Sequence, residues 1–234
     1  MTIQAQVFVI VAVTAALALL MWRMGAAARK ANPYEKPKGL AFLALTLVET
    51  VDGLVAGVTT HPGYRKWMGP YIGAIASYIL VSNLLGLLSI DSPTNNYSVT
   101  LSLTLVTWVL IQATNIRTNG VKGYFKSFFE PYPPFVIMNF FGTIAPLISM
   151  SLRLFGNILS GGFILYLFYT FTAYLSSLIP AIGSFNFLGV LIAPFLHAYF
   201  DIFAGCIQMY IFISLSMVFI GNNTPANESS PIEE

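Results

Sequence analysis

Charged side chains are scarce in this chain, whose 234 residues include only 11 Lys and Arg and 9 Asp and Glu. Hydrophobic residues make up 56% of the sequence and charged residues 9%, which leaves too little polar surface for a soluble domain. The few basic residues form no stripe, so no nucleic acid partner is expected. A single cysteine, Cys206, excludes an internal disulfide bond. The composition therefore predicts a protein that crosses a membrane several times.

Five apolar runs are long enough to cross about 30 Å of hydrocarbon at about 1.5 Å per helical residue. They lie at 1–22, 71–90, 97–116, 135–179 and 185–220, and Pro180 and Gly183 mark a bend between the last two. We therefore expect an all-α fold with about five membrane helices. No repeat or linker divides the chain, so residues 1–234 are expected to form a single membrane domain.

Three further segments are polar or amphipathic. Residues 23–70 are expected to form a cytoplasmic loop, in which Leu40 to Val55 has Glu49 and Asp52 on one helical face and apolar residues on another. This pattern predicts a helix lying in the membrane interface. A second interfacial connection is expected at 119–134, and a solvated polar tail at 221–234.

The basic residues predict the orientation. Seven lie in the loop from Arg23 to Lys66 and three in the loop from Arg117 to Lys126, whereas the connections near Asp91 and Pro180 contain none. Basic loops stay on the cytoplasmic side, so we expect the N-terminus outside and the C-terminus in the cytoplasm. No basic residue precedes the first span, which favours a retained anchor over a signal peptide. The lack of a transit peptide favours a bacterial plasma membrane.

The segment 135–179 is about twice as long as a helix that crosses the membrane at right angles. Either two spans meet there in a concealed turn, or one long helix lies steeply tilted and pairs with 185–220. Pro146 and the pair Gly161 and Gly162 could kink this segment, but it contains no polar loop. The charge pattern favours the single tilted helix, because two extra crossings would need such a loop.

Arg153 is the only charged residue between Glu130 and Asp201. An arginine at the centre of a membrane helix costs about 2.5 to 3.5 kcal/mol on insertion scales. It also stays protonated, so it normally faces protein or water and has a function. On a helix, Arg153 shares a broad face of small and polar residues with Asn157 and Ser160. Such a face permits the close approach of another helix.

Asp201 is the only other charged residue from Pro131 to Asn227. His197 precedes it by one helical turn and Gln208 follows it by two, so the three side chains are expected to share one face. A partly desolvated carboxylate there is suited to relaying protons or cations. A metal site is the weaker alternative, because His197 and Asp201 have no third ligand. His197 alone is also consistent with a hydrogen-bonded packing residue.

These residues resemble those of a known family. The run Ser151-Leu-Arg-Leu-Phe-Gly-Asn157 resembles the signature of subunit a of the F-type ATP synthase, the stationary ion-conducting subunit of its membrane sector. The run Gly205-Cys-Ile-Gln-Met-Tyr-Ile-Phe212 resembles the last-helix segment of that family. Val81-Ser-Asn-Leu-Leu-Gly-Leu-Leu88 resembles an earlier span with a membrane asparagine at Asn83. The likeness extends from Pro33 to Asn222.

The resemblance implies a role for each matching residue. Arg153 would be the stator arginine, Gln208 its partner across the hairpin, and Asn157 a polar neighbour that lines the ion path. Many family members have a carboxylate nine residues after the arginine, where this chain has Gly162. Asp201 would therefore carry the outer relay, beside His197.

An inner route would rely on neutral residues, because Asn139 stands where some relatives have an acid. Its expected lining is Asn139, Thr143 and Ser149 with water. The other candidate lining residues are His197, Ser160, Gly162 and Asn83.

The resemblance also implies partners. A ring of c subunits would place its carboxylates against Arg153, beside the tilted hairpin. The b subunits of the peripheral stalk and the rest of the F1Fo complex would join it in the lipid bilayer. Neither a cofactor nor catalysis by this chain alone is expected. Both H⁺ and Na⁺ remain possible coupling ions.

Three other classes of protein fit the sequence less well. A secondary transporter that binds an anion at Arg153 is the main alternative, but it predicts inverted repeats that the sequence lacks. A membrane enzyme would need a nucleophile, a metal set or paired acids in one cleft. A passive anchor would leave Arg153 and Asp201 without a role.

Overall fold

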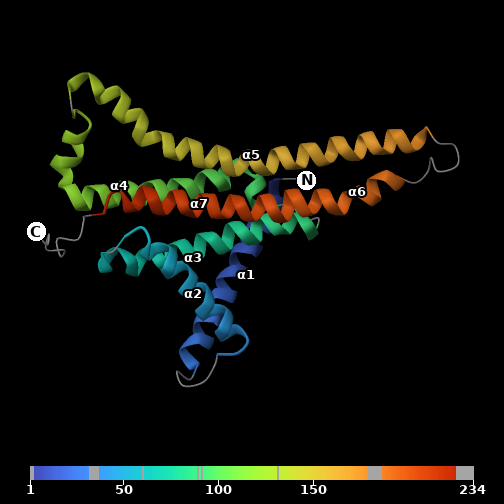
Figure 1. Ribbon diagram of the computed structural model, residues 1–234, viewed down its shortest axis with the longest axis horizontal. Coiled ribbons are helices and arrows are strands. Elements are labelled where there is room, and N and C mark those ends of the chain that lie inside the picture. The colour runs from blue at the N-terminus through green and yellow to red at the C-terminus, as the bar shows by residue number, and fades with distance from the viewer. Residues whose placement is uncertain are drawn as a thin grey trace, which may run out of the picture.

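The computed structural model describes residues 3–31, 37–59, 61–88, 90, 92–130, 132–178 and 186–224. Every regular element in these ranges is helical, which confirms the all-α prediction (Figure 1). The α-helices are α1 (Ile3–Lys30), α2 (Leu40–Ala56), α3 (Pro62–Leu84), α4 (Tyr97–Ser127), α5 (Val136–Ser177), α6 (Phe187–His197) and α7 (Ala204–Gly221). Shorter turns are η1 (Leu85–Leu88), η2 (Pro93–Asn95), η3 (Pro133–Phe135) and the π-helical η4 (Ala198–Phe203).

Five helical segments of the described chain are long and apolar enough to cross a membrane, as predicted. They are Val7–Lys30, Pro62–Leu87, Tyr97–Ser127, Pro133–Ser177 and Phe187–Gly221. Three of them extend well beyond the predicted spans, and the first is α1, which continues to Lys30. Helix α3 begins at Pro62, where proline has no N–H to leave unpaired and the His61 ring caps the first turn. Helix α4 continues to Ser127 across a kink at Gly120, whose φ of 69° is accessible to glycine.

Helix α5 is one uninterrupted helix of 42 residues, which confirms the long-helix prediction over a concealed turn. It pairs with α6 and α7 along the longest axis of the molecule (Figure 1). Asn186 secures the start of the returning arm, because its amide donates to Thr172 Oγ1 at 3.0 Å and its carbonyl oxygen caps Gly189 N at 2.9 Å. A helix this long rises about 63 Å, so a bilayer of about 30 Å accommodates it only when it is steeply tilted.

The core lies where α3, α5 and α7 meet. Ile72 and Ile79 of α3, Leu154 of α5, and Phe212 and Ile220 of α7 are almost completely buried in one cluster. Helix α4 adds a row of buried threonines whose hydroxyls donate to carbonyls of their own helix. These are Thr100, Thr104, Thr107 and Thr114. Satisfied small polar side chains let α4 pack closely without a desolvation penalty.

Helices α1 and α2 form a pair that diverges from this bundle (Figure 1). Helix α2 buries Val51 and Val55, and its Asp52 accepts an ion pair from Arg65 of α3 at 2.9 Å. The amphipathic pattern thus forms a helix as predicted, while its place in the membrane interface remains a prediction. The predicted bend at Pro180 and Gly183, Asp91, and the tail from 225 onward lie outside the described residues.

Candidate functional site

Arg153 lies exposed in the middle of α5. Its chain neighbours Ser151 and Leu154 are fully buried, which turns the guanidinium away from the core. Ser149 and Ser160 are exposed as well, and they share the arginine's side of the helix with Asn157. We call these four residues the arginine face. The ion pairs within the described ranges are Asp52 with Arg65 and Lys126 with Glu130, and Asp201 is hydrogen-bonded to His197, so none of these carboxylates neutralises Arg153.

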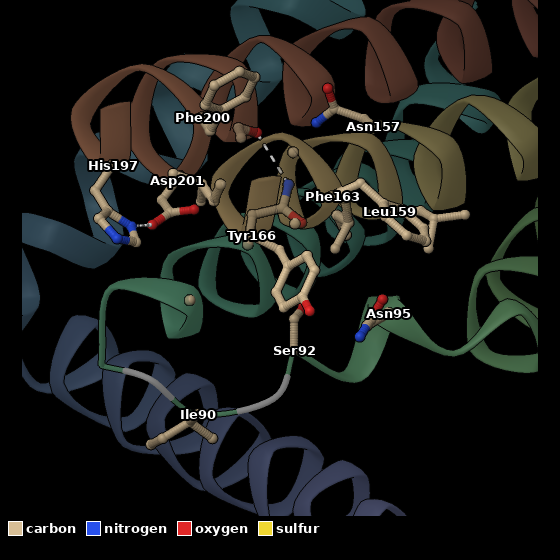
Figure 2. A pocket seen from close by; sticks show the side chains of 17 residues that line it. Ile90, Ser92, Asn95, Asn157, Leu159, Phe163, Tyr166, His197, Phe200 and Asp201 are labelled. Carbon is tan, nitrogen blue, oxygen red and sulfur yellow. Dashed lines mark hydrogen bonds and ion pairs between the residues drawn. The ribbon is translucent and has the colours of Figure 1, made fainter. Parts of the chain in front are cut away.

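A cavity of about 470 Å³ opens beside this face, between α5, the connection from α3 to α4, and the segment from α6 to α7 (Figure 2). Its lining combines five of the predicted residues. These are Asn83, Asn157, Gly162, His197 and Asp201. Ser92, Asn95 and Tyr166 add further polar groups. The cavity therefore brings polar groups to a space that is large enough for several water molecules, in an otherwise apolar part of the chain.

Asp201 and His197 form the ionisable part of the cavity wall. Asp201 Oδ2 lies 2.6 Å from His197 Nδ1, and the two side chains are 16% and 34% exposed (Figure 2). The other ring nitrogen, Nε2, lies 2.9 Å from the hydroxyl of Tyr169 on α5. A carboxylate bonded to an imidazole at a cavity wall can take up and release a proton.

The π-helical turn η4 modifies the predicted polar face. His197, Asp201 and Gly205 all line the cavity, but Gln208 does not. A π-helix holds more residues per turn than an α-helix, so it rotates the later side chains away from their expected direction. Gln208 is instead buried at 5% exposure, and its Nε2 has no hydrogen-bond partner within the described chain. No described bond joins Gln208 to Arg153, so their pairing remains a prediction.

Asn83 connects three elements at the cavity floor. Its Nδ2 donates to the carbonyl of Gly205 on α7 at 3.1 Å, and its Oδ1 accepts from Thr94 in η2 at 3.4 Å. Gly205 makes this approach possible, since a Cβ there would lie 3.0 Å from Asn83 Cβ. Gly86 also lies beside the cavity wall, where a Cβ would be in van der Waals contact with Asp201 Oδ1 at 3.4 Å.

The comparisons with known proteins place the chain in a family. The family model for the ATP synthase A chain matches residues 7–221. The chain belongs to this family.

Individual relatives agree with the family match. ATP synthase subunit a 2 of Chlorobaculum tepidum is 30% identical over 211 residues, which cover 88% of this chain and 58% of that protein. The sodium ion specific ATP synthase subunit a of Propionigenium modestum is 34% identical over 173 residues, 67% of this chain and 54% of the relative. ATP synthase subunit a of Mycoplasma pneumoniae is 34% identical over 229 residues, 90% and 74% respectively. The chain thus spans less than two thirds of the length of the first two relatives.

In this member of the ATP synthase A chain family, the residues predicted for an inner route lie away from the cavity. Asn139 Nδ2 donates to the carbonyls of Phe128 and Glu130, each at 2.9 Å, and so binds the start of α5 to the connection after α4. The Thr143 carbonyl accepts from Trp108 Nε1 at 2.8 Å. Ser149 is exposed on the arginine face. Their part in ion conduction remains a prediction.

Sequence reasoning missed Tyr169 and the hydroxyl-bearing connection near Ser92. One signal was present, because a tyrosine within a long apolar helix usually finds a hydrogen-bond partner for its hydroxyl. The sequence does not indicate which residue is that partner, since His197 lies 28 positions away on another helix.

Proposed function

We propose that this chain is the stationary ion-conducting subunit of an F-type ATP synthase membrane sector. In this proposal Arg153 faces a rotor ring of c subunits, and two offset half-channels lead ions to and from the rotor carboxylates. The observation that carries the proposal is the exposure of Arg153 on a membrane helix, without an ion pair among the residues that the structure describes.

An unpaired guanidinium facing lipid would be costly, so this surface needs a polar or anionic neighbour. The flanking Ser149 and Ser160 are small enough to admit a second helix closely. A rotor carboxylate supplies the missing charge, since opposite charges attract strongly where water is scarce.

This pairing explains how a leak is prevented. An ion-loaded, neutral carboxylate can move through lipid, whereas an ionised one is stable only beside a cation or water. When a rotor carboxylate meets Arg153, the arginine holds it in the ionised state. Ions then cannot pass directly between the half-channels. They cross the membrane only while bound to the carboxylates of the rotating ring. Each ion that crosses 100 mV supplies about 2.3 kcal/mol.

The cavity beside the arginine face is the proposed outer half-channel. Asp201 and His197 line it, and Asn157, which also lines it, lies one helical turn from Arg153 on α5. An ion that enters past Asp201 would reach the rotor near Asn157. The inner half-channel would leave near Asn139, Thr143 and Ser149.

The arrangement of helix ends supports the proposed topology. Tyr64 bonds Thr118 at 3.2 Å, and Thr118 Oγ1 donates to the Asn223 carbonyl at 2.7 Å. The start of α3 and the end of α7 therefore meet α4 just before its kink at Gly120. The basic residues near Tyr64 and Thr118 thus gather at one end of the bundle. We assign that end to the cytoplasm of a bacterial cell, with the N-terminus outside.

The proposed partners follow from the same arrangement. The c-ring would cover the arginine face, and the F1 sector would lie on the cytoplasmic side. Helix α1 exposes apolar side chains such as Phe8 at 74% and Val11 at 60%, which suits contact with lipid and with the b subunits of the peripheral stalk.

Replacing Arg153 by alanine tests the proposal. We expect the complex to assemble normally while ion-driven ATP synthesis is abolished, measured in reconstituted vesicles under a proton or a sodium gradient. Leu152→Ala is the matched control, because Leu152 is 53% exposed on the same turn but uncharged. Normal coupled synthesis in Arg153→Ala would overturn the proposal. The two gradients also identify the coupling ion.

A further inference from the structure

Both ring nitrogens of His197 are engaged, each by a different element. Nδ1 lies 2.6 Å from Asp201 Oδ2 in η4, and Nε2 lies 2.9 Å from the hydroxyl of Tyr169 on α5. The rings of Tyr169 and His197 also face each other, with centroids 6.2 Å apart and planes tilted by 38°. The imidazole is therefore held from two sides of the hairpin.

The chemistry of the three groups leaves one consistent arrangement of hydrogens when Asp201 is ionised and His197 is neutral. A carboxylate only accepts hydrogen bonds, so Nδ1 must carry the ring proton and donate it to Oδ2. Nε2 then has a lone pair, so it must accept from the Tyr169 hydroxyl. The Tyr169 hydroxyl can donate this hydrogen bond to Nε2. The Tyr169 hydrogen bond thus selects the tautomer that serves Asp201.

Tyr169 is itself well anchored. Its carbonyl accepts from Thr172 Oγ1 at 3.2 Å and from Asn186 Nδ2 at 3.5 Å. Asn186 stands at the start of α6, so these bonds tie the backbone at Tyr169 to the arm that carries His197. The hydroxyl is consequently presented to Nε2 from a fixed position rather than from a freely moving surface side chain.

We propose that Tyr169 is a positioning residue of the outer half-channel, which holds His197 with its Nδ1–H directed at Asp201. This inference rests on the proposed function and adds to it that the ions relayed by Asp201 are protons. Without the hydroxyl, Nε2 loses its donor and the ring is free to turn or to adopt the other tautomer. In that tautomer a lone pair on Nδ1 faces the carboxylate, and Asp201 loses its hydrogen-bond donor.

The first test measures passive proton flux through the membrane sector in vesicles after removal of F1. Tyr169→Phe keeps the ring and removes only the hydroxyl. We expect the flux to fall about fivefold, the factor that corresponds to losing about 1 kcal/mol of net hydrogen bonding. Tyr174→Phe is the matched control on the same helix, because Tyr174 is 63% exposed and its hydroxyl has no bond within the described chain. Its flux should equal that of the wild type.

A double-mutant cycle separates positioning from a general packing effect. If Tyr169 acts through His197, adding Tyr169→Phe to a His197→Gln background should produce no further loss. A second fivefold loss in that background would overturn the inference, because the tyrosine would then act without the imidazole.

The tautomer provides a spectroscopic test. The chain has only two histidines, His61 and His197. The complex would be labelled with ¹⁵N-histidine, and its spectrum recorded with and without the substitution His197→Gln. The difference between the two spectra contains the signals of the His197 ring. We expect the Nδ1–H tautomer in the wild type and a mixture in Tyr169→Phe. An unchanged spectrum in Tyr169→Phe would contradict the inference.

The failures of the two proposals are distinguishable. Wild-type flux in both His197→Gln and Asp201→Asn would refute the assignment of the cavity as the outer half-channel. Impaired flux in those two variants, with normal flux in Tyr169→Phe, would reject only the role of Tyr169.

Discussion

Asparagine at position 201 would preserve the shape of the side chain while removing its ability to take up a proton. The Asp201 carboxylate accepts from His197 Nδ1 at 2.6 Å and is only 16% exposed. Gly86 lies close on its other side, where a Cβ would be 3.4 Å from Oδ1. An amide of the same size fits this space and its oxygen can still accept from Nδ1. We therefore expect Asp201→Asn to fold and to assemble.

The expected loss concerns proton transfer rather than stability. A positioned group that exchanges protons contributes about 10² to 10⁴-fold to a rate. The cavity of about 470 Å³ is large enough to admit water, which would offer a slower bypass around residue 201. We therefore expect the lower end of that range, about 100-fold, which corresponds to about 2.7 kcal/mol in the barrier.

The assay is proton uptake into vesicles that contain the membrane sector without F1, driven by a potassium diffusion potential and followed from about pH 6 to 9. Glu49→Gln is the matched control, because it makes the same change at an exposed carboxylate on α2. If Asp201→Asn conducted like the wild type across the whole range, Asp201 would be a packing residue and the outer route would lie elsewhere.

Three further predictions concern other parts of the chain. Arg153→Lys should largely abolish ATP synthesis, because lysine can lose its proton in an apolar site and lacks the planar guanidinium; substantial synthesis would argue against a need for arginine. Gly162→Ala should leave folding intact or stabilise α5, since a Cβ there meets nothing within 4 Å, whereas Gly205→Ala should destabilise the protein by about 1 to 3 kcal/mol through its approach to Asn83. Equal unfolding midpoints in detergent titrations of these two variants would contradict this difference. Asn139→Ala should loosen the start of α5, which faster amide hydrogen exchange after Ser127 would reveal and unchanged exchange would refute.

Much of the fold could be predicted because membrane insertion constrains sequence strongly. A single helix at 135–179 followed from the lack of any polar loop, and α5 confirms it. The start of α3 was harder to predict, since Arg65 and Lys66 resemble a loop in composition. Their charge is compatible with a helix because they lie in its first turns, and Arg65 pairs with Asp52.

The cavity could be predicted only in part. Asn83, Asn157 and Asp201 stood out because each is polar within an apolar segment. These residues line one cavity because of contacts such as the hydrogen bond from Asn83 to Gly205. That bond joins residues 122 positions apart, so no periodic pattern in the sequence predicts it. The π-helical turn η4 also escaped prediction, so the expected face from His197 to Gln208 was extended too far along α7.

Cysteine cross-linking to the ring tests most directly whether the arginine face meets the rotor. The native Cys206 would first be replaced by serine. A cysteine would then be introduced into the c subunit, one helical turn from the rotor carboxylate. We predict that Ser149→Cys and Ser160→Cys, both exposed, form disulfides with the ring, and that the fully buried Ser151→Cys does not. Assembled complexes in which neither exposed position links to the ring would contradict the placement of Arg153 against the rotor.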